Sequence, residues 1–229
     1  MKKRMTLLAT CALALSVNGA SAEILAMMSY ESKPAEDLKS LKLSGSEERR
    51  EGIAIIDVDP NSPAFGKWLA DIPLDATGVA HHLFYDRTMS KLYLTSLGQP
   101  ALQVMEMSDF PPRLKTIDIP NCSMGEDIII DDANEYWYLT CMNSGNVWQG
   151  RVSDDTVTGE IKLPGTNPHG LAVDTNIDRI LVTSTIKGDL TDPGETISIV
   201  QASTLELLEE IKVSSKPSPS GEAPVELLR

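Results

Sequence analysis

The sequence contains three copies of one pattern: HHLFYDRTMSKLYLTS at residues 81–96, EDIIIDDANEYWYLTC at residues 126–141 and HGLAVDTNIDRILVTS at residues 169–184. In each copy an aspartate precedes a threonine by nine residues, and successive copies start 45 and 43 residues apart. Self-similarity at a fixed period is typical of repeat architectures. The repeat therefore carries the main information about the fold.

Each copy predicts a β-hairpin. A short apolar run is followed by an aspartate, a turn of small polar residues and a second run rich in strand-forming residues. Two more strands fit after each copy, at 101–107 and 114–119, at 146–152 and 157–163, and at 196–201 and 207–213. Four short strands in about 40 to 45 residues are typical of a propeller blade. We therefore predict an all-β fold, a β-propeller of four-stranded antiparallel blades; a β-sandwich, in which hairpins also recur, is the alternative.

The predicted propeller is incomplete. Blade repeats begin near residues 78, 123 and 166, after strand-like segments at 24–30, 53–59 and 67–72. Residues 31–51 are polar and charged and are expected to form a surface loop. A further blade is expected to start near residue 221, where Gly221-Glu222 matches Gly125-Glu126. Since complete propellers have about four to eight blades, residues 23–229 are expected to form a partial propeller of about three blades plus an N-terminal partial blade, truncated at roughly half a ring.

Residues 1–22 have the features of a bacterial secretory signal peptide. Basic residues 2–4 precede an apolar run at 6–17 and an Ala-Ser-Ala site that ends at Ala22. The apolar run is shorter than the roughly 20 residues that span a bilayer, so we expect cleavage after Ala22 rather than a membrane anchor. A lipid anchor at Cys11 is disfavoured because Thr10 stands where a smaller residue is expected. The protein is predicted to be periplasmic or secreted.

The net charge of the chain argues against some classes of binding partner. The chain has 229 residues, 20 of them basic and 33 acidic, and a net charge of −13; without the three basic residues of the predicted signal, the net charge is −16 over 207 residues. This balance argues against nucleic acid and anionic membrane surfaces, which select basic faces. No nucleophile elbow, P-loop, zinc-protease or EF-hand motif is present in the sequence. A small-molecule substrate remains compatible with the sequence, and open blade edges favour self-association.

Three histidines, His81, His82 and His169, are the candidate metal ligands. His81, Glu126 and His169 occupy the same repeat position, and the first strand of a propeller blade starts near the central channel. Equivalent positions therefore converge there. Imidazole suits copper, zinc, iron or nickel, and a carboxylate can complete the site. We predict a metal site at His81, His82, His169 and Glu126; the alternative is a set of hydrogen-bonded histidines without a metal.

His81 and His82 are adjacent in the sequence, which limits how both rings can bind one metal ion. Adjacent residues of a regular strand point to opposite faces, so both rings can reach one metal only where the chain bends. Gly78, Val79 and Ala80 are compatible with such a bend. In a regular strand, His82 would support its neighbour or pack elsewhere.

Two cysteines remain after the predicted signal, Cys122 and Cys141. Cys122 and Met124 precede Glu126 and could be soft ligands for Cu(I). A Cys122–Cys141 disulfide and a free thiol are the alternatives. The other prominent residues are assigned structural roles: Trp137, Tyr138 and Trp148 as packing aromatics, and Asp86, Asp131 and Asp174 as turn formers.

Several segments resemble the selenium-binding protein family, which includes bacterial methanethiol oxidases. They are IDVDPNSP at residues 56–63, His81-His82, residues 94–97, residues 112–115 and residues 216–224. Residues 167–184 are equally similar to YVTN or YncE-type propellers.

The resemblance implies a seven-bladed periplasmic propeller with copper held by histidines. In that family, the oxidase converts methanethiol, oxygen and water into formaldehyde, hydrogen sulfide and hydrogen peroxide. By position, the paired histidines carry over onto His81 and His82. The chain departs from the family at residues 121–126, where a further histidine is absent, and the family's cysteine-containing selenium-binding segment is not visible. The sequence leaves open a copper-dependent thiol oxidase, a metal carrier, a non-catalytic binding module and an inactive fragment.

Overall fold

The computed structural model of the chain describes residues 24–31, 50–109, 113–164, 167–185 and 194–213. Every regular element in these ranges is a β-strand. The strands are β1 (Leu25–Glu31), β2 (Glu51–Asp57), β3 (Trp68–Leu74), β4 (Ala80–Tyr85), β5 (Lys91–Ser96), β6 (Ala101–Glu106), β7 (Leu114–Asp118), β8 (Gly125–Ile130), β9 (Tyr136–Cys141), β10 (Asn146–Arg151), β11 (Val157–Lys162), β12 (Asn167–Asp174), β13 (Arg179–Thr185), β14 (Thr196–Gln201) and β15 (Leu207–Lys212).

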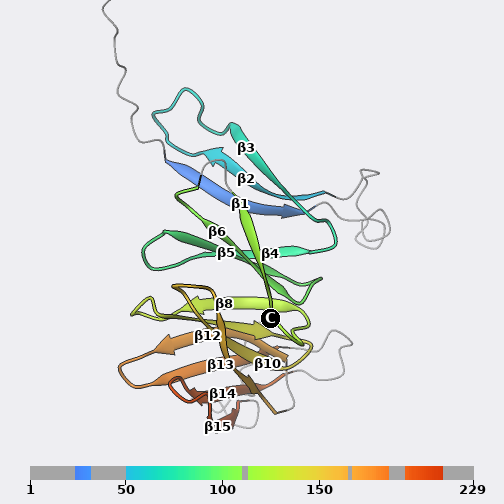
Figure 1. Cartoon of the computed structure of the whole chain (residues 1–229), viewed down its shortest axis with the longest axis vertical. Helices are drawn as coiled ribbons and strands as arrows, with labels where there is room; N and C mark the ends of the chain where they lie inside the picture. The colour runs from blue at the N-terminus through green and yellow to red at the C-terminus, as the bar shows by residue number, and fades with distance from the viewer. Residues whose placement is uncertain (1–23, 32–49, 110–112, 165–166, 186–193, 214–229) are drawn as a thin grey trace, which may run out of the picture.

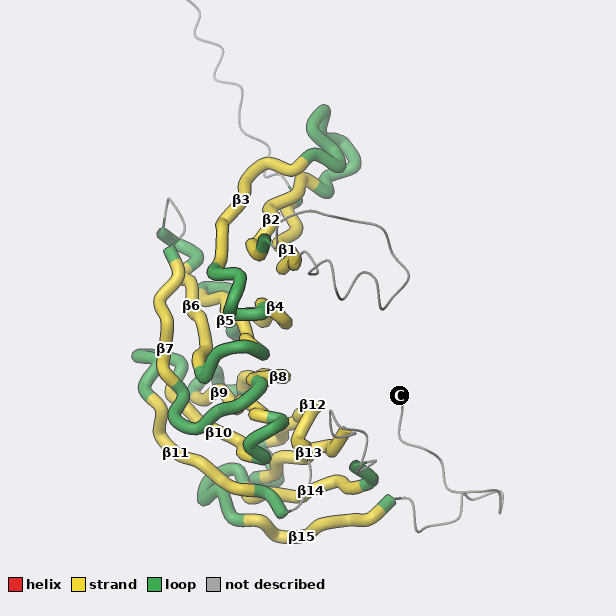
Figure 2. Tube along the Cα trace, turned by 90° about the vertical axis from the view of Figure 1, so that its right-hand side faces the viewer, coloured by secondary structure: helices red, strands yellow, loops and turns green. Residues whose placement is uncertain are grey.

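The strands form four antiparallel sheets, each a meander in which neighbours in sequence are paired. The sheet orders are β1-β2-β3, β4-β5-β6-β7, β8-β9-β10-β11 and β12-β13-β14-β15. We call these sheets the first, second, third and fourth blades. The blades follow one another along the long axis (Figure 1) and form an arc with β4, β8 and β12 on its concave side and β7, β11 and β15 on its convex side (Figure 2). The predicted all-β fold of antiparallel blades is confirmed.

The core lies between the blades and follows the two-residue period of the strands. On β5, Leu92 and Leu94 pack toward the first blade, where Ile53 is also fully buried. Tyr93, between them in sequence, points the other way and packs with Trp137 of the third blade. In the second and third blades, one side of the sheet therefore packs on the preceding blade and the other on the following blade. Full burial of one such large apolar side chain contributes about 1.5–3 kcal/mol, so packing between the blades stabilises the fold.

The repeat aspartates shape the hairpin turns, as predicted. Asp86 Oδ1 accepts hydrogen bonds from the backbone N–H groups of Ser90 (2.6 Å) and Lys91 (2.9 Å). Asp131 Oδ1 accepts one from Glu135 N (2.8 Å), and Asp174 Oδ1 accepts one from Asn176 N (2.9 Å). Trp137, Tyr138 and Trp148 are buried between blades, which confirms their packing role.

Polar contacts also join neighbouring blades. The Arg87 guanidinium donates hydrogen bonds to the backbone carbonyls of Ile130 (2.7 Å) and Asp131 (3.1 Å) in the third blade. The buried Lys91 ammonium donates to Val152 O at 2.6 Å and Asp155 Oδ1 at 3.0 Å. The second and third blades are therefore held by charged groups as well as by their apolar core.

Parts of the predicted organisation lie outside the described residues. These are the signal peptide at residues 1–22, nearly all of the polar loop at 31–51 and the further blade near residue 221. No helix in the described ranges is long and apolar enough to cross a membrane.

Candidate metal centre

A β-bulge at the start of β4 presents the paired histidines. Ala80 pairs with Ser96 and Leu83 pairs with Leu94, so His81 and His82 lie between these two pairs as an irregularity in the ladder. Val79, just before the strand, has a φ of +50°, in the left-handed region. The bend that the sequence required for His81 and His82 to act together is therefore present.

The same irregularity recurs in the next two blades. In β8 it lies between Gly125 and Ile128 and contains Glu126 and Asp127. In β12 it lies between Pro168 and Leu171 and contains His169 and Gly170. Bulges re-aim side chains and are common beside functional sites. The candidate residues thus share a local backbone feature as well as a repeat position.

The repeat threonines hold these bulges. In each blade the threonine Oγ1 accepts a hydrogen bond from the backbone N–H of the second bulge residue. These bonds join Thr95 to His82, Thr140 to Asp127 and Thr183 to Gly170, each at 3.0 Å. The fixed spacing from aspartate to threonine therefore has a physical cause, because one residue makes the turn and the other supports the bulge.

The three histidines lie around the carboxylate of Glu126. Its Oε1 lies 2.9 Å from Nε2 of His81 and 3.2 Å from Nε2 of His169. The imidazole of His82 stacks on that of His81, with ring centroids 3.9 Å apart. One ligand atom from each of His81, His82 and Glu126 lies within 4.8 Å of the others. We call His81, His82, Glu126 and His169 the His–Glu cluster.

The electrostatics of the cluster follow from these contacts. Burial alone would raise the pKa of Glu126, whose side chain is only 5% exposed, but hydrogen bonds with His169 and His81 outweigh burial and lower the pKa to about 2. The hydrogen bond with Glu126 raises the pKa of His169. Burial lowers the pKa of His82, and the neighbouring His81 acts in the same direction. The carboxylate is therefore ionised at neutral pH and lies among three imidazoles.

An open cavity of about 310 Å³ is lined by residues of β4, β8 and β12, and no feature of the sequence indicated it. Phe84 of β4, Ile129 of β8 and Leu171 of β12 supply apolar walls, and Asp127 adds a carboxyl group. Burial raises the pKa of Asp127, and its Oδ2 accepts a hydrogen bond from Leu171 N at 2.9 Å. Asp127 aligns with His82 in the repeat, and this match was the only available sign of its position.

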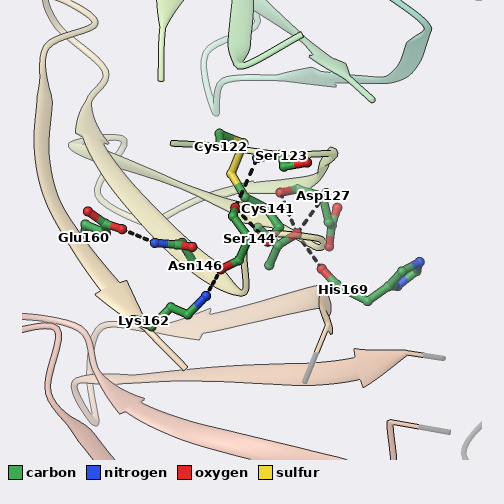
Figure 3. Close-up of a disulfide and its surroundings, with 10 residues drawn as sticks. Cys122, Ser123, Asp127, Cys141, Ser144, Asn146, Glu160, Lys162 and His169 are labelled. Atoms are coloured by element: carbon green, nitrogen blue, oxygen red, sulfur yellow. Dashed lines mark hydrogen bonds between the residues drawn. A yellow bond between two sulfur atoms is a disulfide. The ribbon is translucent and has the colours of Figure 1, made fainter. Parts of the chain in front are cut away.

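Cys122 and Cys141 form a disulfide, with their Cα atoms 5.3 Å apart (Figure 3). The interpretation of Cys122 as a soft copper ligand is therefore wrong, because both sulfur atoms are bonded to each other. Cys141 is the strand partner of Gly125, the residue before Glu126. The disulfide thus anchors the chain just before the cluster, while the His169 ring points away from it (Figure 3).

Comparison with known proteins supports the fold. No protein-family model matches the sequence, and a search of curated proteins finds no match. Among solved structures, a hypothetical selenium-binding protein from Sulfolobus tokodaii is similar with a TM-score of 0.59 and 11% identity over 73% of this chain and 46% of that one. The periplasmic gluconolactonase PpgL of Pseudomonas aeruginosa is similar with a TM-score of 0.55 and 15% identity, over 78% of this chain and 56% of that one. Apo AztD from Citrobacter koseri is similar with a TM-score of 0.50 and 15% identity, over 74% of this chain and 45% of that one.

These identities are low enough that the comparisons establish the fold alone. The chain spans about half the length of the structures that it matches. Together, the fold and the site define a partial β-propeller that carries a His–Glu cluster on the inner strands of its blades.

Proposed function

We propose that this chain is a metal-binding β-propeller, with the metal held by His81, His82 and Glu126 and with His169 adjoining from the next blade. The observation that carries the proposal is the convergence of one ligand atom from each of the first three residues within 4.8 Å. Every histidine in the 229-residue sequence belongs to this cluster.

The donor set suits copper or zinc. Imidazole nitrogen binds both metals, and a carboxylate oxygen can complete either site. Bound copper would supply one-electron redox chemistry, and bound zinc would supply a Lewis acid. Thr95 supports the backbone that carries His82, and Thr140 supports the backbone next to Glu126. Support of this kind from surrounding groups is typical of metal sites.

The disulfide supports a location outside the cytoplasm. Disulfides persist in oxidising compartments such as the periplasm. The Cys122–Cys141 bond agrees with the signal peptide predicted at residues 1–22. We therefore propose that the protein works in the periplasm or is secreted.

Copper-dependent oxidation of a small thiol is a second candidate function. The observation that favours it is the open cavity of about 310 Å³, which Asp127, the residue after Glu126, helps to line. Phe84, Ile129 and Leu171 give this cavity apolar walls, and Arg87 adds a positive charge. A metal carrier would need the cluster but no such cavity.

Metal retention tests the proposal. Chains of residues 23–229 would be loaded with copper or zinc, dialysed, and analysed by mass spectrometry for metal content. We expect about one equivalent per chain, and a loss of affinity of roughly 10–100-fold or more in Glu126→Gln, on the scale seen for changes in metal sites. Glu206→Gln, at an exposed position, is the matched control and should retain the metal. Wild-type protein that retains no metal would contradict the proposal.

A separate assay decides between oxidase and binding protein. Copper-loaded protein would be mixed with methanethiol while oxygen uptake and hydrogen peroxide release are followed. Peroxide release that Glu126→Gln abolishes would support the oxidase. Copper binding without turnover would exclude the oxidase and leave the metal-binding proposal intact.

A further inference from the structure

The cavity beside β8 contains a cationic group that the proposed metal site does not use. Arg87, in the turn after β4, lines this cavity of about 310 Å³ together with the apolar side chains of Phe84, Ile129 and Leu171. Small-molecule sites are typically cavities of roughly 300–1,000 Å³ with apolar walls and a few polar groups. A ligand that fits this cavity would therefore combine an apolar body with a group that Arg87 can bind.

The guanidinium of Arg87 is held in place but is not fully occupied. Its Nε donates a hydrogen bond to the carbonyl of Asp131 at 3.1 Å, and its Nη2 donates one to the carbonyl of Ile130 at 2.7 Å. Nη2 also lies 3.0 Å from Oδ1 of Asp132. Nη1 has no hydrogen-bond partner among the described residues. Because the folded chain already orders the guanidinium, a ligand does not bear the cost of ordering it.

The ion pair between Arg87 and Asp132 does not close the site. The two side chains are 47% and 59% exposed. Ion pairs between exposed side chains contribute little, because water and salt screen them. A ligand carboxylate whose apolar chain is buried in the cavity can therefore compete with Asp132 for the guanidinium.

The free edge of β8 adds a backbone donor next to Arg87. β8 pairs with β9 on one edge, and its other edge faces the concave side of the arc (Figure 2). Asp131 N donates to Tyr136 O at 3.0 Å, so the alternation of an antiparallel ladder turns the N–H and C=O of Ile130 away from β9. The carbonyl of Ile130 accordingly accepts its hydrogen bond from Arg87. The N–H of Ile130 points to the same side.

We propose that this cavity binds a small organic carboxylate, with the carboxylate group on Arg87 and the N–H of Ile130. The apolar chain of the ligand lies against the walls formed by Phe84, Ile129 and Leu171. Ile130 and Asp127 both line the cavity and are three residues apart on β8, so it extends about 10 Å along the strand, which suits a chain of about six carbons.

The proposal does not rest on a bound metal, although the cavity adjoins the His–Glu cluster. The ring of Phe84 meets that of His82 edge-on, with centroids 5.7 Å apart, and Asp127 directly follows Glu126 in β8. The end of the ligand opposite its carboxylate is therefore the end nearer the cluster. A carboxylate ligand differs in class from methanethiol, which has no anionic group for Arg87 to bind.

Binding of hexanoate to the metal-free protein tests the proposal. Residues 23–229, labelled with nitrogen-15 and treated with EDTA, would be titrated with hexanoate while the backbone amide signals are followed by nuclear magnetic resonance. We expect the signal of Ile130 N–H to shift and to saturate, with a Kd of about 1 mM or below. Hexanol and hexylamine should bind about tenfold more weakly or less, because neither offers a charged acceptor to Arg87. The net negative charge of the chain disfavours nonspecific binding of an anion.

Two exposed aspartates provide a matched pair of variants. Asp132→Asn removes the carboxylate that competes for Arg87 and should tighten hexanoate binding about twofold to fivefold. Asp154→Asn is the control, because it changes the net charge equally and removes the carboxylate of another exposed ion pair, 2.8 Å from Arg151. It should leave the Kd unchanged. Arg87→Gln should weaken binding about tenfold or more, with circular dichroism to establish that it is folded.

Three results would each overturn the proposal: hexanoate that causes no saturable shift, hexanol that binds as tightly as hexanoate, and equal Kd values for Asp132→Asn and Asp154→Asn. The comparison of the two aspartate variants holds even if Arg87→Gln fails to fold, because both changes are at exposed side chains. All of these measurements use metal-free protein, so their outcome is separate from that of the metal-retention experiment.

Discussion

At the scale of single residues, one hydroxyl group joins two blades at the cluster. Thr140 is fully buried; its Oγ1 accepts a hydrogen bond from Asp127 N at 3.0 Å and donates one to the carbonyl of His169 at 2.7 Å. It therefore fixes the bulge that carries Glu126 and the backbone of His169 in the next blade.

Thr140→Val should destabilise the protein and disturb the cluster. Valine has nearly the same shape but leaves the N–H of Asp127 and the C=O of His169, both half-buried, without this partner, which costs about 1–3 kcal/mol. We expect a matching fall in the free energy of unfolding measured with urea, together with weaker metal retention. Thr140→Ser should restore both. Thr158→Val, on the exposed strand β11, is the control, and an equal loss there would contradict the role given to Thr140.

Asp86 should make stability depend on pH. Burial alone would raise the pKa of Asp86, but hydrogen bonds from Thr88, Lys91 N and Asn134 outweigh burial and hold the pKa well below the usual range. The unfolded chain has a pKa near ~3.9 at this residue. The ionised group therefore stabilises the fold above that pH, and the stabilisation is lost as pH falls from about 5 toward the lowered folded pKa.

Asp86→Asn removes this effect. We expect it to lower the free energy of unfolding at pH 7 by about 1–3 kcal/mol, because buried donors lose a charged acceptor. Its stability should also change less than that of the wild type between pH 5 and pH 3. Urea unfolding across this range is the measurement, with the exposed Asp118→Asn as control. Parallel pH curves for wild type and Asp86→Asn would show that Asp86 has no such role.

The residue scale also shows what the sequence could predict. Convergence of His81, Glu126 and His169 was predictable, because repeat-equivalent positions in stacked blades become neighbours in space. The sequence predicted that His82 joins the site only if the strand bends there. That bend is the bulge that the hydroxyl of Thr95 supports. Asp127 was missed because its proximity to the cavity depends on the same irregularity in β8.

At the scale of elements, the disulfide stabilises the third blade. It closes a loop over a sequence separation of 19 residues, for which the chain-entropy estimate is about 3 kcal/mol. A Cys122→Ala/Cys141→Ala variant should lose approximately that amount in urea unfolding. Reducing agent should lower the stability of the wild type to the same level and leave the variant unchanged. A wild-type protein whose free energy of unfolding does not change on reduction would contradict this assignment.

Strand positions were predictable because their side chains alternate and their turns have strong signals. β14 matches its predicted range of 196–201 at both ends, and β10 begins at Asn146 as expected. Cysteine pairing was not predictable from spacing, since a disulfide, a soft ligand and a free thiol all fitted the same two positions. Only the pairing of Cys141 with Gly125 across β8 and β9 brings the sulfur atoms together.

At the scale of the whole molecule, the arc puts β4, β8 and β12, the strands that carry the candidate residues, on its concave side (Figure 2). The incomplete ring could be inferred from the number of repeats in the sequence. The side of each strand that packs on the neighbouring blade could not be inferred, because it depends on the register and the bulges of the folded sheets. Tyr138 is 2% exposed because it packs between the third and fourth blades, whereas Leu181, at the same repeat position of the fourth blade, is 44% exposed.

The central claim is that the His–Glu cluster binds a metal ion, and the imidazole signals of the histidines test it most directly. The chain contains three histidines, so a nuclear magnetic resonance spectrum of their ring nitrogens reports on this cluster alone. On titration with zinc, we expect the signals of His81 and His82 to change and to saturate at one equivalent per chain. Ring signals that stay unchanged in excess zinc and show no broadening with copper would contradict the claim.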